Sequence, residues 1–177
     1  MPPPFEPPFS TLTNFKDLCD FLREEGVVFT ADVDAHVVEI PPHSAGVSCP
    51  LVIRWEWQTS LVQLIQLMFD VPATTRAATE RAIGLLNHAA PRAGFAMDPE
   101  RGFAYYRLTL QRDERDAVTV GQLNRGLAAT VSTVRDYLPL LHSIAYASNA
   151  TLTDTSPDDV TDVVKTSSDP TRALGPD

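Results

Sequence analysis

Two apolar strands joined by a short polar turn are predicted at residues 51–69, LVIRWEWQTSLVQLIQLMF. The first strand, residues 51–57, alternates apolar with polar residues, and successive side chains of a strand point to opposite faces. One face is therefore apolar and carries Leu51, Ile53, Trp55 and Trp57. A strand with one wetted face is typical of an antiparallel sheet that is covered by helices on its other face.

The second strand, residues 61–69, follows the turn Gln58-Thr59-Ser60. Its apolar residues also fit a helical spacing of three and four, so a helix is the alternative. We favour the strand because the segment lacks a capping residue and ends at Val71-Pro72.

The other elements alternate in the same way. Helices are predicted at residues 13–25, ending at Gly26, at residues 74–90, and from Thr119 onwards. Further strands are predicted at residues 27–33, 36–40, 94–97 and 103–110. The order is helix, three or four strands, helix, β-hairpin and long helix. This order predicts an α+β fold in which helices pack on one face of a five- or six-stranded antiparallel sheet.

The long C-terminal helix begins with a capping box. The Thr119 hydroxyl can accept from the backbone of Gln122, and the Gln122 side chain can reach back to Thr119. Pro139 is expected to kink this helix or to restart it, because proline removes one backbone hydrogen bond.

Both ends of the chain differ in composition from the middle. Residues 1–12 begin MPPPFEPPFS and are predicted to be a flexible, proline-rich arm. Residues 149–177 contain six acidic and two basic residues and few aromatics, so a disordered acidic tail is predicted. One folded domain is expected between them, at residues 13–148.

The charge of the chain restricts its partners. Fourteen basic and 23 acidic residues give a net charge of −9, which repels phosphate backbones and disfavours direct binding of nucleic acid. A basic partner protein is favoured instead. The N-terminus does not resemble a signal peptide and no apolar run is long enough for a transmembrane helix, so no membrane association and a cytoplasmic location are expected.

No catalytic, cofactor-binding or metal-ligating residue is predicted. The motifs GxGxxG, GxSxG, HExxH and CxxC do not occur. His36 and Glu39 would lie on opposite faces of a regular strand, which argues against a metal site with His43. Asp32 and Asp34 could form a carboxylate pair, but turn residues explain them better. Likewise, residues 98–102, DPERG, are typical of a tight turn.

Six aromatic residues are candidates for a partner or dimer interface. Trp55 and Trp57 are core residues if helices cover their face, and interface anchors if a second protein covers it. The same question applies to Tyr105 and Tyr137. The other two candidates are Phe5 and Phe9 of the proline-rich arm.

Residues 82–141 resemble the YbjN family, a group of bacterial proteins described as candidate sensory transduction regulators. The features that carry the resemblance are Leu86-Asn87, Gly94-Phe95, the turn Asp98–Gly102, Tyr106-Arg107, and Asp136 three residues before Pro139. The resemblance implies a fold like that of type III secretion chaperones, α-β-β-β-α-β-β-α, which commonly form homodimers and bind extended segments of client proteins. Our element order has one strand more than this pattern.

The sequence and the resemblance together lead to a functional hypothesis. We expect a non-enzymatic, chaperone-like adaptor that binds a partner protein as a homodimer. The partner could be a basic, nucleic-acid-binding protein. The alternative is a small-molecule-responsive sensory or regulatory protein with a pocket between sheet and helices.

Overall fold

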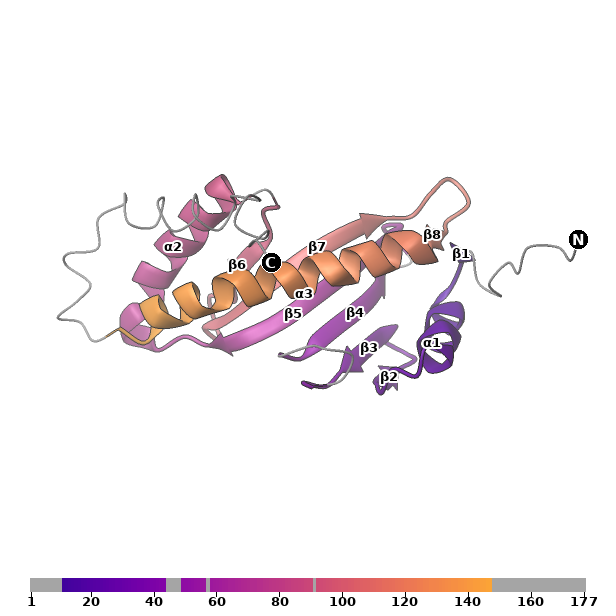
Figure 1. Ribbon diagram of the computed structural model, residues 1–177, viewed down its shortest axis with the longest axis horizontal. Helices are drawn as coiled ribbons and strands as arrows, with labels where there is room; N and C mark the ends of the chain where they lie inside the picture. The colour runs from indigo at the N-terminus through magenta and orange to yellow at the C-terminus, as the bar shows by residue number, and fades with distance from the viewer. Residues whose placement is uncertain (1–10, 44–48, 57, 91, 148–177) are drawn as a thin grey trace, which may run out of the picture. The chain divides into compact units, whose positions relative to one another are not determined.

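The structure is a computed structural model of the 177-residue chain. It describes residues 11–43, 49–56, 58–90 and 92–147 (Figure 1). Phe5, Phe9 and Trp57 lie outside the described residues, as do most of the predicted arm and the whole of the predicted tail.

The described chain contains both helices and strands in the predicted alternation. The helices are α1 (Phe15–Glu24), the short 3-10 helix η1 (Ala73–Thr75), α2 (Arg76–Ala89) and α3 (Val120–Ala145). The strands are β1 (Thr11–Leu12), β2 (Thr30–Asp32), β3 (Val37–Ile40), β4 (Leu51–Glu56), β5 (Leu61–Asp70), β6 (Phe95–Met97), β7 (Phe103–Gln111) and β8 (Val118–Thr119). Four strands, β2 to β5, separate α1 from α2. The sequence predicted three or four strands at this place, whereas the pattern of the YbjN resemblance has three.

Six of the strands form an antiparallel sheet in the order β2-β3-β4-β5-β7-β6, which confirms the predicted fold class. The chain divides into two compact units by its contacts. The first unit comprises Met1–Met68 and Tyr105–Arg135, and the second comprises Phe69–Ala104 and Asp136–Asp177. Strands β5 and β7 and helix α3 contribute to both units, which are described separately below.

The core of the first unit lies on one face of its strands. Leu51, Ile53 and Trp55 of β4 are buried, and Ile53 pairs with the buried Leu64 of β5. The residues between them are half-buried or exposed, as the alternation predicts. Helices α1 and α3 cover the apolar face with Leu18, Leu22 and Leu123, among others.

Residues 61–70 form a strand and not a helix, which confirms the strand prediction. Their burial alternates along most of β5, and the whole of β4 pairs with this strand from Leu51↔Gln66 to Glu56↔Leu61. The apolar residues of this segment fit a helix and a strand equally well, and pairing with β4 selects the strand.

A second, two-stranded sheet was not predicted. Thr11 pairs with Thr119 and Leu12 with Val118 in an antiparallel register. Leu12 is completely buried in the core of the first unit. The structure thus places the last two residues of the predicted arm in a strand that is tied to the start of α3.

Helix α3 begins with the predicted capping box. The Thr119 hydroxyl accepts from the Gln122 backbone N–H at 3.1 Å, and the Gln122 side-chain oxygen accepts from the Thr119 backbone N–H at 2.9 Å. The helix then continues through Pro139 to Ala145 as one element. The alternative that a new helix restarts at Pro139 is therefore wrong.

In the second unit, Asn87 fixes the end of α2 to β6. Its side-chain amide donates to the Phe95 carbonyl at 2.8 Å, and its oxygen accepts from the backbone N–H groups of Gly94 and Phe95, both at 3.0 Å. The Phe95 ring also contacts Tyr137 of α3 edge to face, with ring centres 5.7 Å apart. The Asn87 contacts explain physically why an asparagine precedes a Gly-Phe strand start in this sequence.

The hairpin tip at residues 98–102 is a turn, as predicted. The Asp98 carboxylate accepts from the backbone N–H groups of Glu100 and Arg101 at 2.9 and 3.0 Å. Those hydrogen bonds lower the pKa of Asp98. Gly102 has a φ of +71° and its N–H donates to the Asp98 carbonyl at 2.7 Å. The charged residues of this tip therefore build the turn itself.

We predict that Gly102→Ala destabilises the protein more than Gly26→Ala does. Both glycines have a φ of +71°, so each alanine costs about 1 kcal/mol of backbone strain. At Gly102, a Cβ would also clash with the guanidinium of Arg76, whose Nη2 donates to the Arg101 carbonyl at 3.2 Å. Moving the guanidinium adds a loss of about 1 kcal/mol.

Chemical denaturation of the two variants measures the difference, since a Cβ built on Gly26 has no neighbour within 4 Å among the described residues, apart from the adjacent residues of the chain. The additional loss should disappear when Gly102→Ala is made in an Arg76→Ala background. Equal losses in both single variants would contradict the close contact between Arg76 and Gly102.

Candidate functional site

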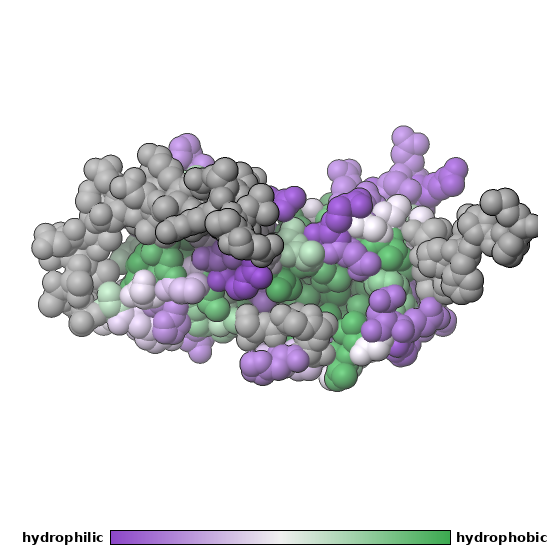
Figure 2. All heavy atoms as spheres, viewed as in Figure 1, coloured by the Kyte–Doolittle hydropathy of each residue, from purple (hydrophilic) through white to green (hydrophobic). Residues whose placement is uncertain are grey.

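An apolar groove in the first unit is the candidate functional site. It has a volume of about 260 Å³ and is lined by Leu22, Val27, Ile40, Leu51, Leu127, Ala128, Val131, Ser132 and Arg135. These residues come from the end of α1, from β3 and β4, and from the middle of α3. Figure 2 shows apolar residues gathered in the middle of the viewed face, among hydrophilic ones. The groove can accept apolar groups between the two helices and the sheet.

The wall at the end of α1 is set by the way this helix terminates. The Gly26 N–H donates to the Arg23 carbonyl at 3.0 Å, and the Val27 N–H donates to the Leu22 carbonyl at 2.9 Å. This pair of hydrogen bonds, with a left-handed glycine between them, is a Schellman motif, which brings the residue after the glycine against the last turn of the helix. Leu22 and Val27 are thereby placed side by side on the groove.

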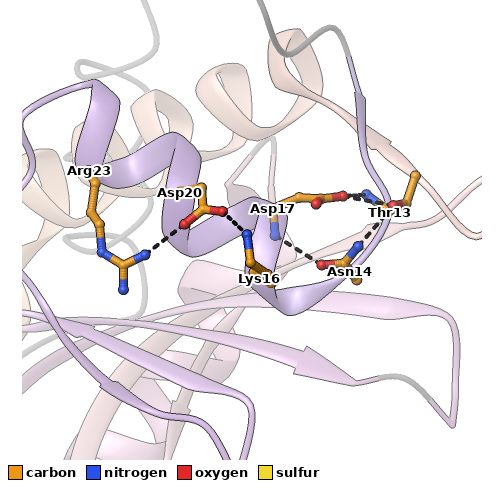
Figure 3. Close-up of polar contacts among 6 residues, drawn as sticks. All are labelled: Thr13, Asn14, Lys16, Asp17, Asp20 and Arg23. Carbon is orange, nitrogen blue, oxygen red and sulfur yellow. Dashed lines mark hydrogen bonds and ion pairs between the residues drawn. The ribbon is translucent and has the colours of Figure 1, made fainter.

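The other end of α1 is fixed by side-chain caps, which Figure 3 shows together. Asn14 accepts from the Asp17 backbone N–H at 3.0 Å. The Asp17 carboxylate accepts from the Thr13 backbone N–H at 2.9 Å and from the Thr13 hydroxyl at 2.7 Å. Partial burial raises the pKa of Asp17, but the hydrogen bonds from Thr13 and Asn14 outweigh it and lower the pKa overall. The ionised carboxylate therefore stabilises the start of the helix.

A charged row continues along the exposed side of α1 (Figure 3). Asp20 forms ion pairs with Lys16 one turn before it and with Arg23 three residues after it. The hydrogen bond and the charge of Lys16 lower the pKa of Asp20. The polar side of α1 is thus satisfied within the helix, and its apolar side faces the core that borders the groove.

The floor of the groove adjoins two buried polar side chains. Gln66 of β5 is completely buried and is the direct pairing neighbour of Leu51, which lines the groove. Neither its amide nitrogen nor its oxygen has a hydrogen-bond partner among the residues that the structure describes. The hydroxyl of Thr130 on α3 is in the same situation. Helix α3 packs tightly here, since a Cβ on Gly126 would lie 2.9 Å from Leu64 Cδ1.

A second, polar pocket of about 330 Å³ lies near the turn between β4 and β5. In its lining, Glu56 accepts a hydrogen bond from the Thr59 hydroxyl at 3.0 Å. Glu56 also forms a long ion pair with Arg54 at 3.8 Å. His36 also lines this pocket, but its ring contacts Phe15. Most of the charged groups here are engaged with protein neighbours, so we do not favour this pocket as the site.

The histidine and carboxylates near that pocket have local structural roles. His36 has a φ of +52° and precedes β3, which begins at Val37 and not at residue 36 as predicted. The Asp32 carboxylate accepts from the Ala35 N–H at 2.9 Å and stabilises the turn. Within the described ranges, no three His, Cys, Asp or Glu side chains lie together as metal ligands would.

The predicted interface residues fall into three groups. Trp55 and Tyr137 are only 3% and 7% exposed, so both are core residues of their units and present no free surface. The indole of Trp55 is also covered by the Arg112 guanidinium, 5.2 Å from the ring centre. Tyr105 is half-buried and alternates with the buried Ala104 and Tyr106, so it lies on the sheet face opposite the core. Phe5, Phe9 and Trp57 lie outside the described residues.

The groove was not predicted from the sequence. The residues that line it were predicted to lie in helices and strands, and most of them do. Val27 is the exception: it was predicted to begin the strand at residues 27–33, but β2 comprises only Thr30–Asp32, and Val27 instead follows the end of α1. The only local signal was the Gly26-Val27 pair, because a Schellman motif places an apolar residue beside the helix end.

The fold is similar to two solved structures. YbjN of E. coli, a candidate transcription regulator, aligns with a TM-score of 0.56 and 11% sequence identity over 75% of this chain and 92% of YbjN. A chain of the HopA1-SchA chaperone-effector complex aligns with a TM-score of 0.48 and 18% identity over 71% of this chain and 94% of that one. No protein-family model and no curated protein matches the sequence. The likeness to YbjN confirms the fold that the sequence resemblance implied.

Membrane insertion through a helix has no support in the described part of the chain. None of its helices combines the length and the apolar character that crossing a bilayer requires.

We predict that Gln66→Met raises the thermal stability of the protein. Burying an amide without partners costs about 1–3 kcal/mol, and methionine fills a similar volume without that cost. A gain of about 1 kcal/mol corresponds to a rise of about 2–4 °C in the melting temperature for a chain of this size. Calorimetry measures it.

Gln63→Met is the matched control, since Gln63 lies on the same strand but is half-buried on the other face. This control should leave the melting temperature nearly unchanged. A lower melting temperature for Gln66→Met would mean that the amide has a stabilising partner.

Proposed function

We propose that this protein is a non-enzymatic, chaperone-like adaptor whose domain, residues 13–148, binds an extended segment of a partner protein. The observation that carries the proposal is the apolar groove between α1, α3 and the sheet. Seven of its nine lining residues are apolar, and the other two are Ser132 and Arg135. Such a lining offers burial of apolar side chains and little chemistry for a covalent reaction.

The charge of the adaptor favours a basic partner. The net charge of −9 gives a field that attracts cationic proteins and increases their association rate. We therefore propose a partner segment in which apolar residues are flanked by Lys or Arg, such as occurs in nucleic-acid-binding proteins. Its apolar side chains would enter the groove and its basic residues would remain at the rim.

A small-molecule sensor is the alternative function. Drug-sized ligands usually occupy pockets of about 300–1,000 Å³ that enclose most of the ligand. The groove, at about 260 Å³, is smaller than that range, so its size favours a few side chains of a peptide.

We further propose that the adaptor is a homodimer that uses the open face of its sheet. Val52, Ile65 and Leu67 point to the face opposite the core, because each alternates with buried residues of β4 or β5. Val52 pairs directly with Ile65. We propose that they form, with Tyr105 of the neighbouring strand β7, an apolar patch that a second copy covers, and we call it the open-face patch. Cytoplasmic location is part of the proposal, since the free thiols of Cys19 and Cys49 would stay reduced there.

We predict that display of random peptides on the full chain selects sequences with apolar residues flanked by Lys or Arg. Val131→Asp should lower the affinity for a selected peptide at least about tenfold, because a bound apolar side chain would have to desolvate the new carboxylate. Fluorescence anisotropy with the labelled peptide measures this.

Ala89→Asp, an exposed position on α2 outside the groove, is the matched control and should bind as the unmodified chain does. Selection of no common peptide pattern, or equal binding by Val131→Asp, would refute the proposed function.

We predict that Tyr105→Glu converts the dimer to a monomer. The substitution places two like charges in a two-fold interface formed by the open-face patch. Light scattering coupled to size exclusion gives the mass of each variant, with Arg81→Glu, an exposed position on α2, as the comparison for added negative charge. A monomeric unmodified chain would refute the homodimer, and a dimeric Tyr105→Glu variant would refute this interface.

A further inference from the structure

The N-terminal arm is anchored beside the helix that forms one wall of the groove. In the pairing of β1 with β8, Thr11 lies opposite Thr119 and Leu12 opposite Val118. The N-terminal side of Thr11 is therefore the side on which the chain leaves Thr119 to enter α3.

We propose that residues 1–10 of this chain occupy the apolar groove in cis, with Phe5 inserted in it. The inference rests on the proposed function of the groove and adds its regulation: the arm competes with the partner segment for the same site.

The length of the arm matches the position of the groove. The groove-lining residues of α3 begin at Leu127 and end at Arg135, which lie about 10 and 22 Å along the helix axis from Val120. A polyproline-like chain advances about 3 Å per residue, so in that conformation Phe5 would lie about 19 Å from Thr11 and Phe9 only about 6 Å. Phe5 is therefore within reach of the groove, whereas Phe9 reaches only the first turns of α3.

The composition of the arm suits this site. The Phe5 ring can fill an apolar groove that is lined mainly by aliphatic side chains. All five prolines in the arm lie within three residues of Phe5, and they restrict the free chain, so little conformational entropy is lost on docking. Glu6, next to Phe5, carries a charge opposite to that of Arg135 at the end of the groove.

The tether makes even a weak contact effective. A segment that is joined to its site by a few residues has an effective concentration in the millimolar range. If the arm fills the groove in nine of ten molecules, the apparent affinity of a competing ligand falls about tenfold. The partner must then displace the arm before it can bind.

The test compares the full chain with a variant that lacks residues 2–10 and keeps the paired residues Thr11 and Leu12. Methyl NMR spectra follow Val27, Leu51, Leu127 and Val131 in the groove, with Ile83 and Leu86 of the second unit as reference signals. We expect the truncation and Phe5→Ala to shift the groove methyls in the same way, through loss of the ring, and to leave the reference methyls in place. Pro2→Ala, at the far end of the arm, should leave all of them unchanged.

Binding of anilinonaphthalene sulfonate, a fluorescent apolar probe, gives a second readout. We expect about tenfold tighter binding to the truncated chain and to Phe5→Ala than to the full chain. Unchanged groove methyls together with equal probe binding would overturn the inference.

The two proposals fail in different ways. If the truncation shifts the groove methyls but no displayed peptide binds either chain, the proposed function fails and the arm inference stands. If a displayed peptide binds both chains equally and the methyls do not move, the arm inference fails and the proposed function stands.

Discussion

The pairing of β4 with β5 is the constraint on which the first unit depends. Its register sets Ile53 opposite Leu64 and Trp55 opposite Val62, so the buried side chains of both strands share one face. A shift by one residue would turn that whole apolar set to the other side of the sheet. Helices α1 and α3 cover the face that this register makes apolar. The groove lies where the two helices leave part of that face accessible.

Most of the fold could be predicted because its signals are local. Gly26 ends α1 and Gly102 closes the β6–β7 turn, each with a left-handed backbone that few other residues adopt. Thr119 and Gln122 mark the start of α3 with side chains that cap each other. The β1–β8 pairing had no such signal. Two residues beside a proline-rich segment carry no strand pattern, and only Val118, more than 100 residues away, gives Leu12 its partner.

The site could be predicted less well than the fold. The groove exists because neighbouring elements leave some apolar residues of α3 uncovered, and the sequence does not show which ones. Leu127 and Val131 belong to the same apolar stripe of α3 as the buried Leu123, and the sequence pattern is identical for all three. Whether a stripe residue is covered depends on how far the neighbouring helix extends. Leu127 and Val131 have the pattern of core residues but line a groove. Trp55 is the opposite case, because tryptophan is typical of interfaces but this one is buried in the core under Arg112.

The buried amide of Gln66 bears on why the groove exists. Every other buried residue of β4 and β5 that faces the helices in the first unit is apolar, so Gln66 is an exception to the pattern beside a groove wall. Thr130 repeats the exception on the α3 side. A chain under selection for stability alone would replace both side chains, since each costs free energy that an apolar residue would not. Local rules are most often broken where a protein binds something. An extended segment in the groove would bring backbone N–H and carbonyl groups close to Leu51, the pairing neighbour of Gln66, and these are the partners that a carboxamide needs.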